Sequence, residues 1–184
     1  MKNNTLILCI GGAASNIITT LQKGLSNQSI FQSSDIIVAD VNQYSLTSIS
    51  TNFEHIKTIT LNWDIKDFSS EIFNNISKLL IVVGLGGKTS SEYSLYAIKK
   101  AKELGIKSIF IIATIPFKFE GGKRKYAQSI AQQLSDLTEK NIHIIDNEDL
   151  ITKHPDINWS NVFNYADIEV INNIKSLNIT NLSL

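Results

Sequence analysis

The chain has 184 residues, with 17 basic and 17 acidic side chains, so its formal net charge at pH 7 is zero. This length fits a single domain, and 43% apolar with 18% charged residues argues against a disordered chain. Zero net charge argues against a nucleic-acid binder, which normally has a basic excess. Arg124 is the only arginine among the basic residues. Arginine suits bidentate contacts with phosphate or carboxylate, so Arg124 is a residue of interest.

The single cysteine, Cys9, excludes an internal disulfide and suits a reducing compartment. No signal peptide is evident, because polar residues 2–5 lead directly into a short apolar run. The longest apolar runs, such as residues 109–115, are far shorter than the roughly 20 residues that a membrane-spanning helix needs. We therefore expect a cytoplasmic protein without membrane insertion.

Short apolar runs alternate with longer amphipathic segments along the whole chain. The apolar runs predict strands at residues 6–10, 35–39, 56–61, 79–83, 108–113 and 142–145. The amphipathic segments predict helices at residues 13–25, 43–50, 67–77, 89–104, 120–139 and 159–177, with Asp67 or Ser69 as the N-cap of the third. This alternation predicts a three-layer, Rossmann-like α/β fold, with a mostly parallel six-stranded sheet and helices on both faces. No linker or repeat is evident, so we predict one domain over residues 1–184.

Ligands of such sheets bind at the carboxyl ends of the strands, where the strand order reverses. The first predicted strand is followed there by the turn Gly11-Gly12-Ala13-Ala14-Ser15-Asn16, which opens a helix. Small residues let a phosphate approach the backbone N–H groups, and the helix dipole favours an anion. The dinucleotide fingerprint Gly-x-Gly-x-x-Gly is not matched, since only its middle glycine is present. Taken alone, the turn is equally compatible with a tight strand-to-helix connection.

A second glycine-rich turn follows the fourth predicted strand. Its sequence is Gly84-Leu85-Gly86-Gly87-Lys88-Thr89-Ser90-Ser91, and it also opens a helix. Successive N–H groups there can cradle phosphates, and Lys88 adds a point charge. The spacing is not that of a Walker A loop. Side by side in a sheet, the two turns would hold both ends of a polyphosphate.

Further candidates follow the fifth and sixth strands. Glu120 and Arg124 are spaced i, i+4 on a predicted helix, where an ordinary surface pair is the plain interpretation. Arg124 also falls at the ligand edge of the sheet, which favours a functional role. Asn147 follows the sixth strand, and Phe163 and Asp167 lie one turn apart on the last helix. An aromatic face and a carboxylate at this spacing can stack on a base and accept its N–H groups. Taken alone, a core phenylalanine and a solvated helix charge are the simpler interpretations.

Together these segments resemble the nucleotide-binding domain of the tubulin and FtsZ superfamily, FtsZ most closely. The first turn is similar to Gly-Gly-x-Gly-Ser/Asn-Asn, and residues 86–92 take the place of the signature Gly-Gly-Gly-Thr-Gly-Thr-Gly. Residues 116–124, Pro-Phe-Lys-Phe-Glu-Gly-Gly-Lys-Arg, resemble Pro-Phe-x-Phe-Glu-Gly-x-x-Arg and form the most specific match. Asn147 with Leu150 resembles Pro-Asn-Asp-x-Leu, and residues 163–167 resemble Phe-x-x-Ala-Asp of the central helix. The resemblance covers nearly the whole chain, in order.

The resemblance implies a site for GTP or GDP, with Mg²⁺ as a companion of GTP. Asn16, Asn147 and Asp167 would contact the guanine, and Phe163 would stack on it. Glu120 and Arg124 would touch the ribose and phosphates. The phosphates would lie against residues of the two turns: Gly11, Gly12, Ala13, Ser15, Gly84, Gly86, Gly87, Lys88, Thr89 and Ser90. No catalytic residue is predicted, and the scattered histidines predict no metal site.

The phosphate end departs from the family pattern. Glycines of the family are replaced by Cys9, Ala14, Lys88, Ser90 and Glu92, and Asn42 stands where the Asn-Thr-Asp motif has its aspartate. Residues 52–77 are too few for the loop that senses the gamma-phosphate. The sequence also stops just after the central helix, whereas FtsZ continues with a catalytic carboxylate loop and a second domain. These differences imply slow or absent GTP hydrolysis and no filament formed by this chain alone.

We therefore predict an FtsZ-like guanine-nucleotide-binding protein that modulates the assembly of full-length FtsZ or another FtsZ-like subunit in cell division. A pseudo-GTPase interaction module that binds no nucleotide is the alternative. A Rossmann-type NAD-dependent oxidoreductase is a third reading, with Asp40 holding a ribose hydroxyl. The missing glycines weigh against it.

Overall fold

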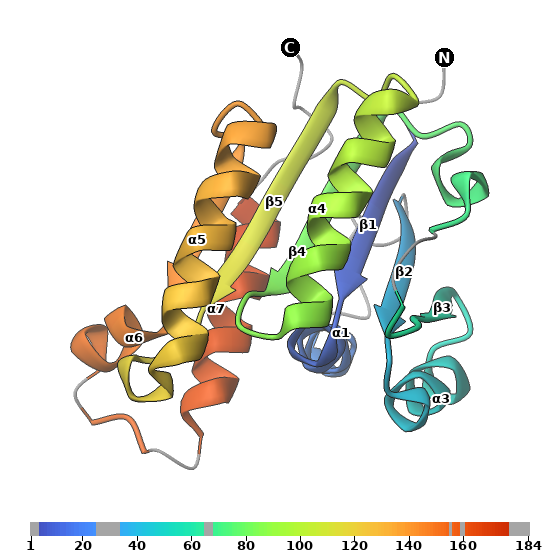
Figure 1. Cartoon of the computed structure of the whole chain (residues 1–184). Coiled ribbons are helices and arrows are strands. Elements are labelled where there is room, and N and C mark those ends of the chain that lie inside the picture. Colours follow the sequence, from blue (N-terminus) through green and yellow to red (C-terminus); the bar gives the residue numbers. More distant parts are fainter. Residues whose placement is uncertain (1–3, 25–33, 65–67, 155, 159–160, 177–184) are drawn as a thin grey trace.

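The computed structural model describes residues 4–24, 34–64, 68–154, 156–158 and 161–176 (Figure 1). Six apolar segments form one parallel sheet: β1 (Thr5–Ile10), β2 (Ser34–Asp40), β3 (Ile56–Thr60), β4 (Lys78–Gly84), β5 (Ser108–Ile115) and β6 (Ile142–Asp146). The strand order is β3-β2-β1-β4-β5-β6, and every neighbouring pair is parallel. Central strands of such a sheet are covered on both faces, which is why they are continuous Ile, Leu and Val runs. The predicted fold class is confirmed.

Helices cover both faces of this sheet (Figure 1). The α-helices are α1 (Gly12–Gly24), α3 (Gln43–Asn52), α4 (Lys88–Glu103), α5 (Gly122–Leu137), α6 (Asn147–Lys153) and α7 (Val162–Ser176). Alternate β1 residues face opposite layers: Leu8 packs into the cluster that includes α4 and α5, and Cys9 into the cluster that includes α1 and α7. The helix after β1 therefore covers one face and the helix after β4 covers the other. This arrangement makes the β1–β4 boundary the switch point at which a ligand crevice is expected.

Two predicted helices differ from the structure. The segment predicted as a helix over 67–77 is a single 3₁₀ turn, η1 (Ser70–Phe73), with Ser69 Oγ accepting from Glu71 N as the N-cap. Asn75 follows in the left-handed region (φ 61°), which no helix can continue through. Asp67, the other proposed N-cap, lies outside the described residues, as does Trp159 at the predicted start of the last helix.

The predicted helix 120–139 is divided at Gly121. The 3₁₀ turn η2 (Lys118–Glu120) ends there, and α5 begins at Gly122. Gly121 has φ +52°, a conformation that favours glycine over other residues. The short helix α6 was not predicted, because seven residues carry too little periodicity to show an amphipathic pattern. Within the described ranges, no helix combines the length and apolarity needed to cross a membrane.

Candidate functional site

A cavity of about 290 Å³ lies at the carboxyl ends of β1, β4 and β5. It sits at the switch point of the sheet, where a ligand is expected to bind. Ten of the candidate residues line it: Gly12, Ala13, Gly84, Gly86, Gly87, Ser90, Glu120, Asn147, Phe163 and Asp167. Residues from five separate segments are thus brought together around one space.

The two glycine-rich turns lie against each other, because β1 and β4 are neighbours. A methyl group placed on Gly84 would lie 2.6 Å from Ala13 Cβ, and one on Gly11 would lie 2.8 Å from Ser90 Cβ. Gly11 also has φ +84°, which L-residues with a side chain rarely adopt. Glycine at positions 11 and 84 therefore allows α1 and α4 to begin in direct contact.

Several predicted nucleotide contacts lie outside the cavity lining: Gly11, Ser15, Lys88 and Thr89 at the phosphates and Asn16 at the guanine. Gly11 is buried, with its N–H donating to Ala39 O at 2.8 Å. Ser15 is also buried, and its hydroxyl lies 3.3 Å from both Gly11 O and Asp40 Oδ2. Asn16 is exposed, and Thr89 is half-buried. The Lys88 side chain is 82% exposed and lies 3.8 Å from Glu92 Oε1.

Asn147 carries a buried side-chain oxygen that lacks a hydrogen-bond partner among the described residues. It begins α6 and is 7% exposed, and its Oδ1 atom has no hydrogen-bond partner among the described residues. A buried polar atom without a partner costs about 1–3 kcal/mol. Because Asn147 also lines the cavity, an N–H donor of a ligand there is a candidate partner for this oxygen.

Asp167 supplies a second acceptor to the cavity wall from α7. Burial raises the pKa of its carboxyl group to about 6, although a hydrogen bond with Thr20 acts in the opposite direction. A carboxylate with a raised pKa is incompletely solvated. It therefore favours a ligand that donates hydrogen bonds to it.

An aromatic cluster stands at the same end of the cavity. Phe163 lines the cavity and is 57% exposed, and its ring meets buried Phe117 edge to face, with ring centroids 5.5 Å apart. Phe117 also stacks on Phe119 at 5.3 Å. Phe117 thus supports Phe163 from within the protein, which leaves Phe163 available as a flat platform for a base.

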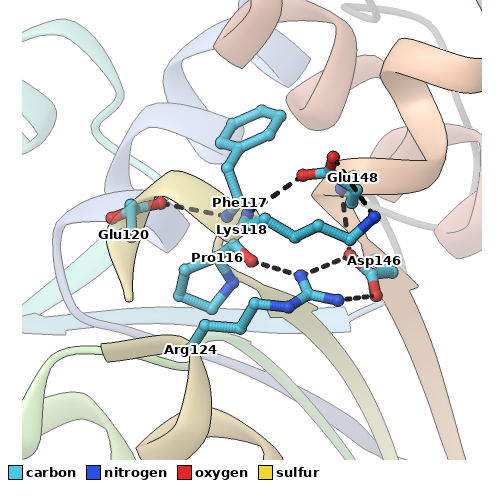
Figure 2. A network of polar contacts seen from close by, with 7 residues as sticks. All are labelled: Pro116, Phe117, Lys118, Glu120, Arg124, Asp146 and Glu148. Atoms are coloured by element: carbon cyan, nitrogen blue, oxygen red, sulfur yellow. Dashed lines mark hydrogen bonds and ion pairs between the residues drawn. The ribbon is translucent and has the colours of Figure 1, made fainter. Parts of the chain in front are cut away.

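Arg124, predicted as a nucleotide contact, is instead bound to Asp146, and it does not form the surface pair with Glu120 that the spacing alone suggests. Figure 2 shows its guanidinium donating to both carboxylate oxygens of Asp146, at 2.7 and 2.6 Å, and to Pro116 O at 2.6 Å. The break at Gly121 separates the two residues: Glu120 instead accepts from Phe117 N at 3.1 Å and lies 3.8 Å from Lys123 Nζ. Arg124 is absent from the cavity lining.

The ion pair of Arg124 and Asp146 is strongly coupled. The hydrogen bond between Asp146 and Arg124 is the main reason that the pKa of Asp146 lies below its ordinary value. The same hydrogen bond raises the pKa of Arg124. Asp146 Oδ1 also accepts from Glu148 N at 2.9 Å and so caps α6, whose first residue is Asn147. Arg124 therefore holds the β6–α6 corner, and Asn147 with it, against the end of β5.

Sequence reasoning missed two residues of this region. Lys123 lines the cavity, whereas its neighbour Arg124 points to Asp146. Asp146 is the N-cap of α6, a role that its position before Asn-Glu-Asp would have indicated. Asp40, the candidate ribose ligand of a dinucleotide site, is 5% exposed, and its Oδ1 accepts from Val41 N at 2.7 Å. That arrangement does not present its carboxylate to a ribose.

Comparisons with known proteins agree with this geometry. No family model matches the chain. The chain is 28% identical over 191 residues to the cell division protein FtsZ of Mycoplasmopsis pulmonis, covering 95% of this chain and 47% of that protein. Among solved structures, the FtsZ W319Y mutant of M. jannaschii matches with a TM-score of 0.78 and 21% identity, covering 96% of this chain and 56% of that one. The chain has the FtsZ-type nucleotide-binding fold.

Other solved structures share this fold with lower sequence identity. CetZ from Methanosaeta thermophila matches with a TM-score of 0.64 and 15% identity, over 97% of this chain and 55% of that one. The chain thus spans about half the length of the proteins that it matches. The resemblance to FtsZ predicted from the motifs is confirmed.

Proposed function

We propose that the cavity binds the guanine base of a guanosine nucleotide. The observation that carries this proposal is the buried, unpartnered Oδ1 atom of Asn147, a residue that lines the same cavity as the half-buried Asp167. Guanine offers adjacent N1–H and 2-amino donors, which a carboxylate accepts together. Phe163 supplies the stacking surface. The similarity to FtsZ supports the same ligand class.

Replacement of Asp167 by asparagine should change the base preference rather than simply abolish binding. An asparagine amide accepts from N1–H and donates to a carbonyl, so Asp167→Asn is expected to prefer xanthosine, which has a carbonyl in place of the 2-amino group. The unaltered protein should prefer guanosine to inosine by about tenfold or more, because inosine leaves the carboxylate partly unsatisfied. Calorimetric titration with the three nucleosides measures these preferences. Asp136→Asn, on the exposed face of α5, is the matched control.

The same titrations should depend on pH. A base that donates hydrogen bonds binds the ionised form of Asp167, whose pKa is about 6. Guanosine affinity is therefore highest above pH 6 and falls as pH decreases through that value, and Asp167→Asn removes this dependence. A protein that binds no guanosine compound at millimolar concentration, and whose Tm does not rise with it, would instead be the pseudo-GTPase interaction module.

We also propose that a polypeptide of residues 1–184 hydrolyses GTP slowly, if at all, and forms no filaments by itself. Phosphoryl transfer depends on a group that positions the attacking water. Glu120, a carboxylate of the cavity lining, is already occupied by Phe117 N and Lys123. The resemblance assigns the water-positioning carboxylates of FtsZ to a neighbouring subunit.

The proposed partner is a full-length FtsZ-type subunit, in the cytoplasm, where Cys9 would remain reduced. The nucleotide face of this chain would dock on the catalytic-loop face of that subunit and stop filament growth. The expected result is a loss of sedimentable FtsZ polymer when residues 1–184 are added at substoichiometric amounts. Unchanged polymer mass and length would contradict the capping role and leave nucleotide binding unaffected.

A further inference from the structure

Ser90 and Ala13 line the cavity at the two glycine-rich turns, away from Asn147 and Phe163 in the sequence. Ser90 packs directly against the first glycine-rich turn, since its Cβ would lie 2.8 Å from a methyl group on Gly11. The Ser90 hydroxyl lies 2.9 Å from Gly84 O and 3.1 Å from Gly87 O, so its proton is used within the turn. Ala13 fills the other side, against Gly84. The Ser90 hydroxyl is therefore not a free donor for a phosphate in the cavity.

The chain's own carboxylate already occupies the electropositive start of α1. Asp40 is 5% exposed at the end of β2, and its Oδ2 lies 3.3 Å from Ser15 Oγ in the first turns of α1. The same oxygen would lie 3.8 Å from a methyl group on Gly12, which lines the cavity. A helix N-terminus favours one nearby negative charge. A phosphate at Gly12 would therefore lie close to the negative charge of Asp40.

The cations of this region are also paired with acids. Lys88 lies 3.8 Å from Glu92, Lys123 lies 3.8 Å from Glu120, and Arg124 is bound to Asp146. The side chains of Lys88 and Lys123 are 82% and 66% exposed, so their attraction for a ligand is weakened by solvent and salt. Several phosphate charges would thus be added next to Asp40, Glu92 and Glu120 with little positive charge to spare.

We propose that this site selects the least phosphorylated guanosine compounds, guanosine itself or its monophosphate, over GTP. This inference rests on the proposed function, because it names which members of the guanosine class the same cavity takes. The base end supplies the binding energy through Asn147, Asp167 and Phe163. The phosphate end contributes negative charge from Asp40, Glu92 and Glu120, so each added phosphate lowers the affinity.

The decisive variant is Asp40→Asn, which removes the charge but keeps the shape. Asparagine Oδ1 can still accept from Val41 N and Asn42 N, the partners of the present Oδ1 atom. Its amide group can donate to Ser15 Oγ, so the fold should be preserved. The control is Asp35→Asn, an exposed aspartate on the same strand at its amino-terminal end. Both variants are titrated with guanosine, GMP, GDP and GTP in the presence of Mg²⁺.

The expected result for the unaltered protein is an affinity that decreases from guanosine or GMP to GTP. Asp40→Asn should raise the affinity for GTP and GDP by about tenfold while leaving guanosine unchanged, and Asp35→Asn should alter neither. GTP that binds tenfold tighter than guanosine, or equal effects of the two variants, overturns this inference while guanine recognition stands. If guanosine itself does not bind, the proposed function fails and the inference falls with it.

Discussion

Gly84→Ala is expected to lower the free energy of unfolding by about 2–3 kcal/mol. The added methyl group would lie 2.6 Å from Ala13 Cβ, a distance at which one of the two helices or strands must move. Ala13 is the second residue of α1, and Gly84 ends β4, so the strain falls directly on the wall of the cavity. Guanosine affinity should fall together with stability. Chemical denaturation and calorimetry on the same protein measure the two effects.

A second substitution separates this clash from other effects of Gly84→Ala. Ala13→Gly removes the opposing methyl group at a helix cost of about 1 kcal/mol. The double variant should therefore be more stable than Gly84→Ala alone, in spite of carrying two changes. Gly122→Ala is the control, because no atom lies within 4 Å of a methyl group there. A double variant that is less stable than either single variant would show that the two turns do not meet at these positions.

Arg124→Ala is expected to lower the free energy of unfolding by about 2 kcal/mol, below the full cost of breaking a buried pair because the partners remain partly solvated. The substitution leaves Asp146 and Pro116 O without the donor that now reaches both. Since Asp146 caps α6, guanosine binding through Asn147 should weaken as well. Denaturation of Arg124→Ala, Asp146→Ala and the double variant gives the coupling energy of the pair. Lys118→Ala removes the more exposed neighbouring pair with Glu148 and should cost less than about 0.5 kcal/mol.

The loss of stability caused by Arg124→Ala should become smaller as the pH is lowered. Arg124 lowers the pKa of Asp146 below its ordinary value of 3.8, so folding favours the ionised carboxylate. The stabilisation is complete above pH 3.8 and is lost as pH falls through the lower pKa of the folded state. The stability difference between the variant and the unaltered protein should therefore shrink in acid. A difference that is constant down to the lowest pH would mean that the arginine acts through packing of its side chain alone.

The sheet and the two turns could be predicted because their signals are local. Strands buried on both faces are short apolar runs, and each turn joins such a run to an amphipathic segment. Asn147, Phe163 and Asp167 were found through their positions after strands and through the resemblance to FtsZ. Their meeting in one cavity depends on α7 packing beside α1, which the spacing of residues does not encode.

The role of Arg124 could not be predicted in this way. Its spacing from Glu120 suggested a helical pair, but the positive φ of Gly121 ends the preceding turn and redirects the side chain. The actual partner, Asp146, is 22 residues away and becomes adjacent only when β6 pairs with β5. The raised pKa of Asp167 likewise arises from burial by several elements at once. Such properties belong to the assembled fold rather than to any one segment.

The pairing of β1 with β4 has a consequence for how the chain folds. Ser77 Oγ bonds to Asn4 O across a separation of 73 residues, and the whole β1–β4 register depends on closing that loop. Loop closure of this length slows folding, and it must come before the two glycine-rich turns can meet. During synthesis the first strand has only β2 as a sheet neighbour until β4 emerges, and the cavity is complete only after α7 has docked. Ligand binding should thus be the last property to recover in refolding, because it requires α7, from the last third of the chain, to pack against α1, from the first third.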